Sequence, residues 1–119
     1  MKNTTKGVLG EQIAKNHLQK QGCLIIKQNY RAGKSEIDII ANDNDTIVFI
    51  EVKARSSNIY GTGLEAITQA KKSMLIQGAY AYISENNLFE SKMRFDAIEV
   101  DLVNKKVTAH IKNAFIVDS

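Results

Sequence analysis

Two acids and a lysine, Asp38, Glu51 and Lys53, have types and a spacing that suit phosphodiester chemistry. Twelve residues separate the acids, and the lysine follows the second acid by two positions. Two carboxylates that share a half-buried site resist ionising together, so they need a compensating cation. Mg²⁺ or Mn²⁺ would fill that role, polarising a phosphate and acidifying water, while an ammonium orients the water. The pattern indicates metal-dependent hydrolysis of nucleic-acid phosphodiesters.

The segment 35–55 around these residues is predicted to form a β-hairpin. Two runs rich in β-branched and apolar residues, 37–41 and 46–53, flank four residues that favour turns, 42–45. If positions 42 and 47 pair across the turn, all paired residue numbers sum to 89. Two antiparallel strands with a fixed register are therefore expected.

This register decides which side chains share a face of the hairpin. Asp38 then lies opposite Glu51, and Glu36 lies opposite Lys53, about 7 Å beyond Glu51. Asp38, Glu51 and the backbone carbonyl of Val52 are expected to hold the metal ion. The other face is wholly apolar and is predicted to be core; it carries Ile37, Ile39, Ala41, Val48, Ile50 and Val52.

Motifs spread over nearly the whole chain resemble a known family. Ile37-Asp38 and Glu51-Val52-Lys53 resemble the PD-(D/E)XK nuclease motif, with Ile in place of its Pro. The wider pattern resembles the bacterial YraN family, which is Holliday-junction-resolvase-like, and comprises Gly10-Glu11, Asn29-Tyr30-Arg31, 36–40, 49–55 and Arg94-Phe95-Asp96. One departure is Ser35, where the family pattern usually has Gly, and it removes no expected ligand.

The resemblance implies an α/β restriction-endonuclease-like core, a mixed sheet of about five strands flanked by helices. At 119 residues the chain is expected to be a single domain, 1–119. The remaining elements are expected as helices over 7–21 and 64–85, strands over 23–29, 95–103 and 106–111, a basic loop over 30–34, a polar loop over 56–63 and a turn at 104–105.

The resemblance also implies roles for residues outside the motif. Glu11 on the first helix would face Asp38 and Glu51 and support a second ion or a water; alternatively it only stabilises the helix dipole. The expected contacts with nucleic-acid phosphates are Arg31, Lys34, Arg55, Gln69 and Lys71. Each of these five is alternatively a solvated surface residue.

Composition and charge narrow the class of protein. Hydrophobic residues make up 44% of the chain and charged residues 24%, as in globular domains. The net charge of +3 is compatible with a nucleic-acid partner, and the resemblance to resolvases implies that this partner is DNA. Apolar runs are too short for a membrane span, and the N-terminus has no signal-peptide core, so a cytoplasmic protein without a membrane partner is expected.

Five further residues are expected to have structural roles. The single cysteine, Cys23, is predicted to be a packing residue in a reducing compartment. His17 and His110 have no partner spacing, so no chemistry is assigned to them. Asp96 and Glu99 are interpreted as surface or pairing charges.

Two alternatives to the nuclease stay open. The chain could be an inactive nucleic-acid-binding module that keeps the acidic residues. It could also be a protein-interaction domain in which Glu36 and Lys53 form a cross-strand ion pair and Asp38 is solvated. Branched DNA as substrate and a homodimer follow from the resemblance to resolvases.

Overall fold

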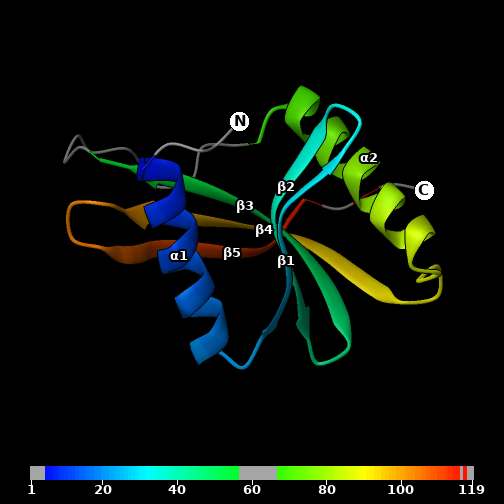
Figure 1. The fold of residues 1–119 in the computed structure, drawn as a ribbon, viewed down its shortest axis with the longest axis horizontal. Helices are drawn as coiled ribbons and strands as arrows, with labels where there is room; N and C mark the ends of the chain where they lie inside the picture. The colour runs from blue at the N-terminus through cyan, green and yellow to red at the C-terminus, as the bar shows by residue number, and fades with distance from the viewer. Residues whose placement is uncertain (1–4, 57–66, 116, 118–119) are drawn as a thin grey trace.

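The computed structural model describes residues 5–56, 67–115 and 117, and it contains five strands and two helices (Figure 1). The elements are α1 (Thr5–Lys20), β1 (Leu24–Ala32), β2 (Ser35–Asp43), β3 (Thr46–Arg55), α2 (Gln69–Glu85), β4 (Lys92–Asp101) and β5 (Lys106–Phe115). The strands form one sheet in the order β1-β2-β3-β4-β5, in which β3 and β4 are parallel and the other neighbours antiparallel. The expected α/β class with a five-stranded mixed sheet is confirmed.

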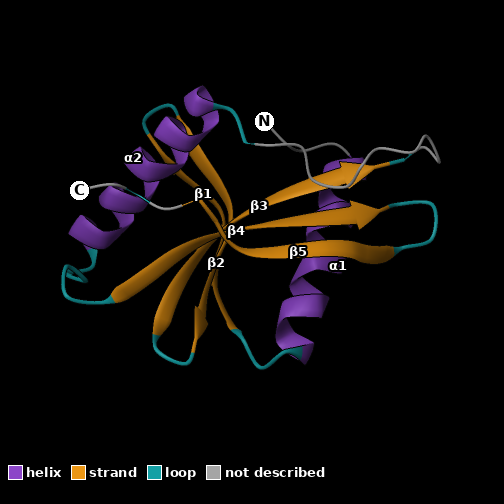
Figure 2. Ribbon diagram, turned by 180° about the vertical axis from the view of Figure 1, so that it is seen from behind, coloured by secondary structure: helices purple, strands orange, loops and turns teal. Residues whose placement is uncertain are grey.

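The parallel pair follows from the position of α2 in the chain. Parallel neighbours need a long crossover, and α2 lies between β3 and β4 in sequence. The two helices cover opposite faces of the strongly twisted sheet, as comparison of Figures 1 and 2 shows. The sheet is therefore buried on both faces, with a separate core under each helix.

The two cores contain alternate residues of the central strands. The core under α1 includes Ala14, Leu18, Cys23, Ile39, Ala41, Val48, Ile50, Val52, Ile98 and Val100. The core under α2 includes Ile37, Ile40, Ile47, Phe49, Leu75, Ala79, Tyr82, Ile83, Phe95 and Phe115. Cys23 is a packing residue, as predicted. The apolar face predicted for the hairpin is correct except at Ile37, which lies in the opposite core.

The displacement of Ile37 has its cause at Asp38. In the β2–β3 ladder the numbers of the paired residues sum to 89, as predicted, from the turn as far as the pair of Ile39 and Ile50. At the next position the Asp38 carboxylate oxygen Oδ2 accepts a hydrogen bond from the Val52 backbone N–H at 2.8 Å. A side chain thus takes the place of a backbone acceptor, and the alternation of faces along β2 is interrupted there.

Several boundaries differ from the sequence expectation. Residues 30–32 belong to β1, so the predicted basic loop is wrong and the turn is confined to Gly33 and Lys34, with Gly33 at a φ of 59°. The helix expected from position 64 begins at Gln69, because the side chain of Thr68 caps it by accepting from the Lys71 N–H at 3.2 Å. Strand β5 continues to Phe115, and the turn before it spans 102–105. The polar loop expected over 56–63 lies outside the described residues except for Ser56.

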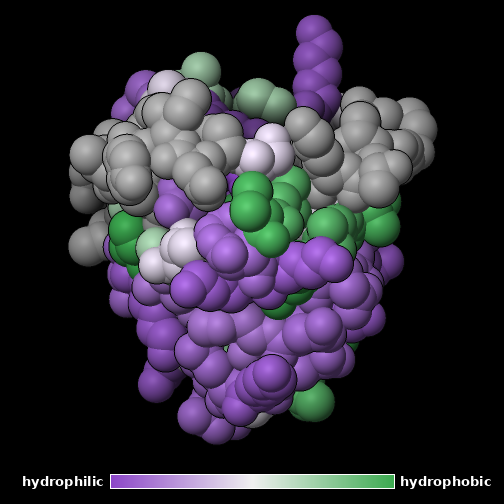
Figure 3. Space-filling model, turned by 90° about the vertical axis from the view of Figure 1, so that its left-hand side faces the viewer, coloured by the Kyte–Doolittle hydropathy of each residue, from purple (hydrophilic) through white to green (hydrophobic). Residues whose placement is uncertain are grey.

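One face of the molecule and the two described helices bear on the question of a membrane span. The side of the molecule with the β4–β5 turn is mostly hydrophilic (Figure 3). Neither of the two helices in the described ranges is long and apolar enough to cross a bilayer.

Gly10 lets α1 lie directly on β3. A Cβ atom at this position would be 2.8 Å from the Cβ of Ala54, closer than side chains approach one another. The contact joins two backbones that cannot easily move apart, and it fixes the first half of α1 on β3.

We expect Gly10→Ala to lower the free energy of unfolding by about 1 to 2 kcal/mol, because overpacking outweighs the higher helix propensity of alanine. Chemical denaturation would measure it, with Gln19→Ala at an exposed position of the same helix as control. The change should couple favourably with Ala54→Gly in a double-mutant cycle. A Gly10→Ala protein more stable than wild type would contradict the close contact.

Candidate functional site

Asp38 and Glu51 are buried acids on the neighbouring strands β2 and β3. Asp38 is 1% exposed and Glu51 is 5% exposed. They lie just beyond the last ladder pair, where the Asp38 side chain bonds to the backbone of β3. The alternative in which Asp38 is a solvated residue is wrong.

Lys71 supplies a cation to this pair of acids. Its ammonium Nζ lies 3.2 Å from Glu51 Oε2, and its side chain is 36% exposed. The Thr68 cap places Lys71 in the first turn of α2, over β3. The next residue, Lys72, instead lies over the ring of Phe115, 5.7 Å from the ring centroid. The sequence predicted Lys71 near the site, but as a phosphate contact and not as a partner of Glu51.

Glu11 is also buried, at 5% exposure, on the α1 side of the sheet. It follows Gly10, which contacts Ala54 near the end of β3. Gly10 thus fixes α1 on β3, the strand that carries Glu51 and Lys53, whereas the expected approach of the Glu11 carboxylate to Asp38 and Glu51 stays a prediction. A role for Glu11 beyond this position stays a prediction.

Lys53 is half-buried and differs from the other cations near the site. Within residues 5–56 and 67–115, no ion pair or side-chain hydrogen bond engages its ammonium. The Glu36 carboxylate, expected as its cross-strand neighbour, instead pairs with Arg31 at 2.8 Å. The alternative built on a Glu36–Lys53 ion pair is therefore wrong.

Three of the five residues expected to contact phosphates are paired with acids, and Lys71 is one of these three. Arg31 pairs with Glu36, and Arg55 Nε lies 3.1 Å from Glu99 Oε2. Lys34 and Gln69 are exposed. Glu99 is thus a buried pairing charge, one of the two roles predicted for it.

The donor types at Asp38 and Glu51 fit a hard divalent cation. Carboxylate oxygens are the ligands that Mg²⁺ and Mn²⁺ prefer, and burial of two of them on adjacent strands favours a compensating cation. In the described part of the chain, no group of three or more His, Cys, Asp and Glu side chains has the spacing of a metal site. A metal here would therefore depend on two carboxylates together with backbone, water or phosphate oxygens.

Under α1, the structure reveals a second polar network that the sequence interpretation missed. His110 Nε2 lies 2.9 Å from Asp96 Oδ2, and the other ring nitrogen of His110 lies 3.1 Å from His17 Nε2. Arg94 joins Asp96 at 3.0 Å to Asp43 at 2.9 Å. The expectation that the histidines have no partners is wrong. The alternation Arg94-Phe95-Asp96 could have indicated a shared face for the two charges, but nothing in the spacing predicted the histidine pair.

Asp96 is the centre of this network, at 1% exposure. Burial opposes its charge, but hydrogen bonds from His110, Arg94 and the Asn113 N–H hold the pKa of Asp96 below its ordinary value. An ionised carboxylate can only accept, so the hydrogen bond runs from His110 Nε2 to Asp96 Oδ2. The network ties β4, β5, α1 and the end of β2 together.

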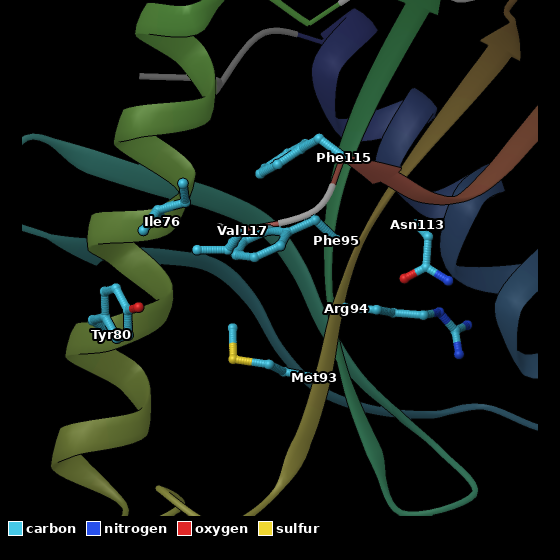
Figure 4. Close-up of a pocket in the computed structure, with 8 residues that line it drawn as sticks. All are labelled: Ile76, Tyr80, Met93, Arg94, Phe95, Asn113, Phe115 and Val117. Atoms are coloured by element: carbon cyan, nitrogen blue, oxygen red, sulfur yellow. The ribbon is translucent and has the colours of Figure 1, made fainter. Parts of the chain in front are cut away.

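An apolar hollow of about 310 Å³ lies between α2 and strands β4 and β5. Figure 4 shows Ile76 and Tyr80 of α2 facing Met93 and Phe95 across it, with the Arg94 guanidinium directed away. None of the expected site residues lines this hollow.

The fold and the sequence comparisons together assign the chain to a family. A mixed sheet with α2 crossing between its parallel strands is compatible with a restriction-endonuclease-like core. The model of a family described as Uncharacterised protein family UPF0102 matches residues 10–100. The chain is 44% identical over 115 residues to a UPF0102 protein of Clostridioides difficile strain 630, covering 97% of this chain and 100% of that one. It is also 44% identical over 116 residues to a UPF0102 protein of Alkaliphilus oremlandii, covering 95% and 99%. The protein belongs to the UPF0102 family, also called YraN, as its motifs indicated.

We expect Asp96→Asn to lower the free energy of unfolding by about 3 kcal/mol, because Arg94 would keep a buried charge without its main partner. The folded pKa of Asp96 is depressed, so its contribution is present above the ordinary value of 3.8 and is lost as the pH falls through the folded pKa. The difference between wild type and variant should therefore be constant near neutral pH and shrink in strong acid.

Denaturant titrations from neutral to acidic pH would check this. Asp45→Asn, at an exposed turn residue, is the matched control and should change stability little. A stability difference for Asp96→Asn that does not change with pH would contradict an ionised Asp96.

Proposed function

We propose that this protein is a metal-dependent nuclease that hydrolyses nucleic-acid phosphodiesters, with branched DNA as a candidate substrate. The supporting observation is the combination of two buried acids, Asp38 and Glu51, with a half-buried lysine two residues further along β3. Arg31, Arg55 and Lys71 are each held by an acid, whereas Lys53 makes no such pair with the described residues. A half-buried ammonium without a partner in the described part of the chain is best explained by a role toward substrate.

Each residue has a defined task in this proposal. Asp38, Glu51 and the Val52 carbonyl would hold Mg²⁺ or Mn²⁺, which supplies charge stabilisation at the phosphate and a more acidic water. The Val52 N–H fixes the orientation of the Asp38 carboxylate. Lys53 orients the attacking water and offsets charge that develops on the phosphate. Glu11 supports a second ion or orders water near β3.

Lys71 favours a second candidate function. Its ammonium already compensates Glu51, so the buried acids have an internal cation without any metal. A protein stabilised in this way could bind nucleic acid through the same surface and carry out no hydrolysis. The two functions differ in what happens when Lys53 or Lys71 is removed.

Lys53→Ala should abolish metal-dependent cleavage while folding and nucleic-acid binding stay nearly intact, because Lys53 acts on the transition state and pairs with no acid among the described residues. Glu51→Ala should abolish cleavage and weaken metal binding as well, since it removes a ligand oxygen. Purified proteins would be incubated with Mg²⁺ or Mn²⁺ and labelled single-stranded, duplex, flap and four-way DNA and RNA. Lys92→Ala, at an exposed position of β4, is the control and should cleave like wild type.

Cleavage that persists in both site variants would indicate a contaminating nuclease. Binding by wild type with no cleavage of any substrate in the panel would favour the docking module. Absence of both binding and cleavage would contradict the nucleic-acid partner itself.

Lys71→Met should enlarge the rise in melting temperature that Mn²⁺ causes, because the ammonium competes with the metal for Glu51. Asp38→Asn should reduce the same rise, and it is well matched because an amide oxygen can still accept from the Val52 N–H. Thermal unfolding with and without millimolar Mn²⁺ would test both. Lys72→Met, one residue along α2, should respond like wild type, and equal shifts in all four proteins would contradict a metal at these acids.

A further inference from the structure

A basic recess lies on the α1 side of the sheet, beside the turn that joins β4 and β5. Its volume is about 290 Å³, and its lining consists of Ile13, Asn16, His17, Lys20, Lys105, Lys106 and Val107. None of the seven lining residues is an acid, and three of them are lysines. The side of the molecule that carries this turn is predominantly hydrophilic (Figure 3). The recess therefore combines a concave shape with one sign of charge, which concentrates anions.

The backbone at Lys105 is unusual. Six non-glycine residues of the described chain have positive φ, and five of them are Asn or Asp: Asn29, Asn44, Asp45, Asn87 and Asn113. The sixth is Lys105, at a φ of 55°. Asn, Asp and Gly adopt this conformation at lower cost than a long side chain does. The turn thus carries a lysine where stability alone favours asparagine, which indicates that the ammonium has a use.

The acids beside the recess have hydrogen-bond partners of their own. Asp101, opposite Lys106 in the β4–β5 register, accepts hydrogen bonds from the Val103 N–H at 2.9 Å and from the Asn104 side chain at 2.7 Å. The hydrogen bonds from Asn104, and to a smaller extent the charge of Lys106, lower the pKa of Asp101. Asp96 is buried behind His110. Lys20 also lies in the last turn of α1, where the helix dipole favours a cation. That effect does not account for Lys105 in the turn and Lys106 directly after it, here called the turn lysines.

We propose that this recess binds phosphates of a nucleic-acid backbone and forms a second contact with the substrate. The inference rests on the proposed function, because it takes nucleic acid as the ligand. His17, in the recess, follows Glu11 on α1 by six residues, which is about 9 Å along the helix axis. This offset is short compared with the length of DNA that a protein of this size contacts, so one substrate could reach both the recess and the candidate site. Lys105, Lys106 and Lys20 contact phosphates without reading bases.

The test compares two double variants with the same change in charge. Lys105→Asn/Lys106→Gln removes the turn lysines, and Lys27→Gln/Lys92→Gln removes two exposed lysines on β1 and β4. Binding to a fluorescein-labelled 30-base-pair DNA duplex would be followed by anisotropy in EDTA over a range of salt concentrations. The slope of log affinity against log salt should fall by about two in the first variant and stay at the wild-type value in the second.

A stability measurement separates binding from folding. Lys105→Asn alone should melt at or above the wild-type temperature, because asparagine tolerates positive φ, and yet its salt slope should fall by about one. A slope unchanged in the turn variants, or lowered equally in both double variants, would overturn the recess as a phosphate site. Wild type that binds no nucleic acid would overturn the recess together with the proposed function, whereas binding without cleavage would contradict the nuclease alone.

Discussion

The hydrogen bond from the Val52 N–H to the Asp38 carboxylate is the interaction on which the candidate site depends. This hydrogen bond lies where the β2–β3 ladder ends, and its acceptor is a side-chain oxygen in place of a backbone carbonyl oxygen. As a result Ile37 packs under α2 while Ile39 packs under α1, and the two cores meet at this residue. The same bond fixes a carboxylate that is 1% exposed, so it serves the fold and orients an acid at once.

Much of the architecture could be predicted from the sequence because it is encoded locally. The hairpin register follows from four turn residues between two alternating strands, and the turn places Asn44 and Asp45 at positive φ, as a tight hairpin needs. The family motifs added the order of elements and the five-stranded sheet. The error at Ile37 arose because a perfect alternation was extended past Asp38. Hydrophobic pattern alone does not reveal that a side chain has replaced a backbone acceptor.

The charge pairs of the site could not be predicted, because they join residues from different elements. Lys71 reaches Glu51 only after α2 has crossed between the parallel strands, and its position depends on the cap at Thr68. His17 and His110 are 93 positions apart and become neighbours only when α1 packs on the sheet. Such contacts depend on tertiary packing, whereas periodicity describes one element at a time. The sequence accordingly assigned Lys71 to the phosphate and Asp96 to no particular partner, and the role of the acids Asp38 and Glu51 stays a prediction.

The distribution of cations separates residues that maintain the fold from residues available to a ligand. Arg55, Lys71 and Arg94 each lie beside a buried carboxylate, so removing any one of them would disturb the protein itself, whereas Arg31 pairs with Glu36 closer to the surface. Lys53 has no such pair among the described residues, and the turn lysines of the basic recess line a cavity without an acid. A net charge of +3 is modest for a nucleic-acid-binding protein, but it understates the positive charge that is available. Arg31, Arg55 and Arg94 are each paired with an acid, whereas Lys53 and the lysines that line the basic recess lie at the two places proposed for a phosphate backbone.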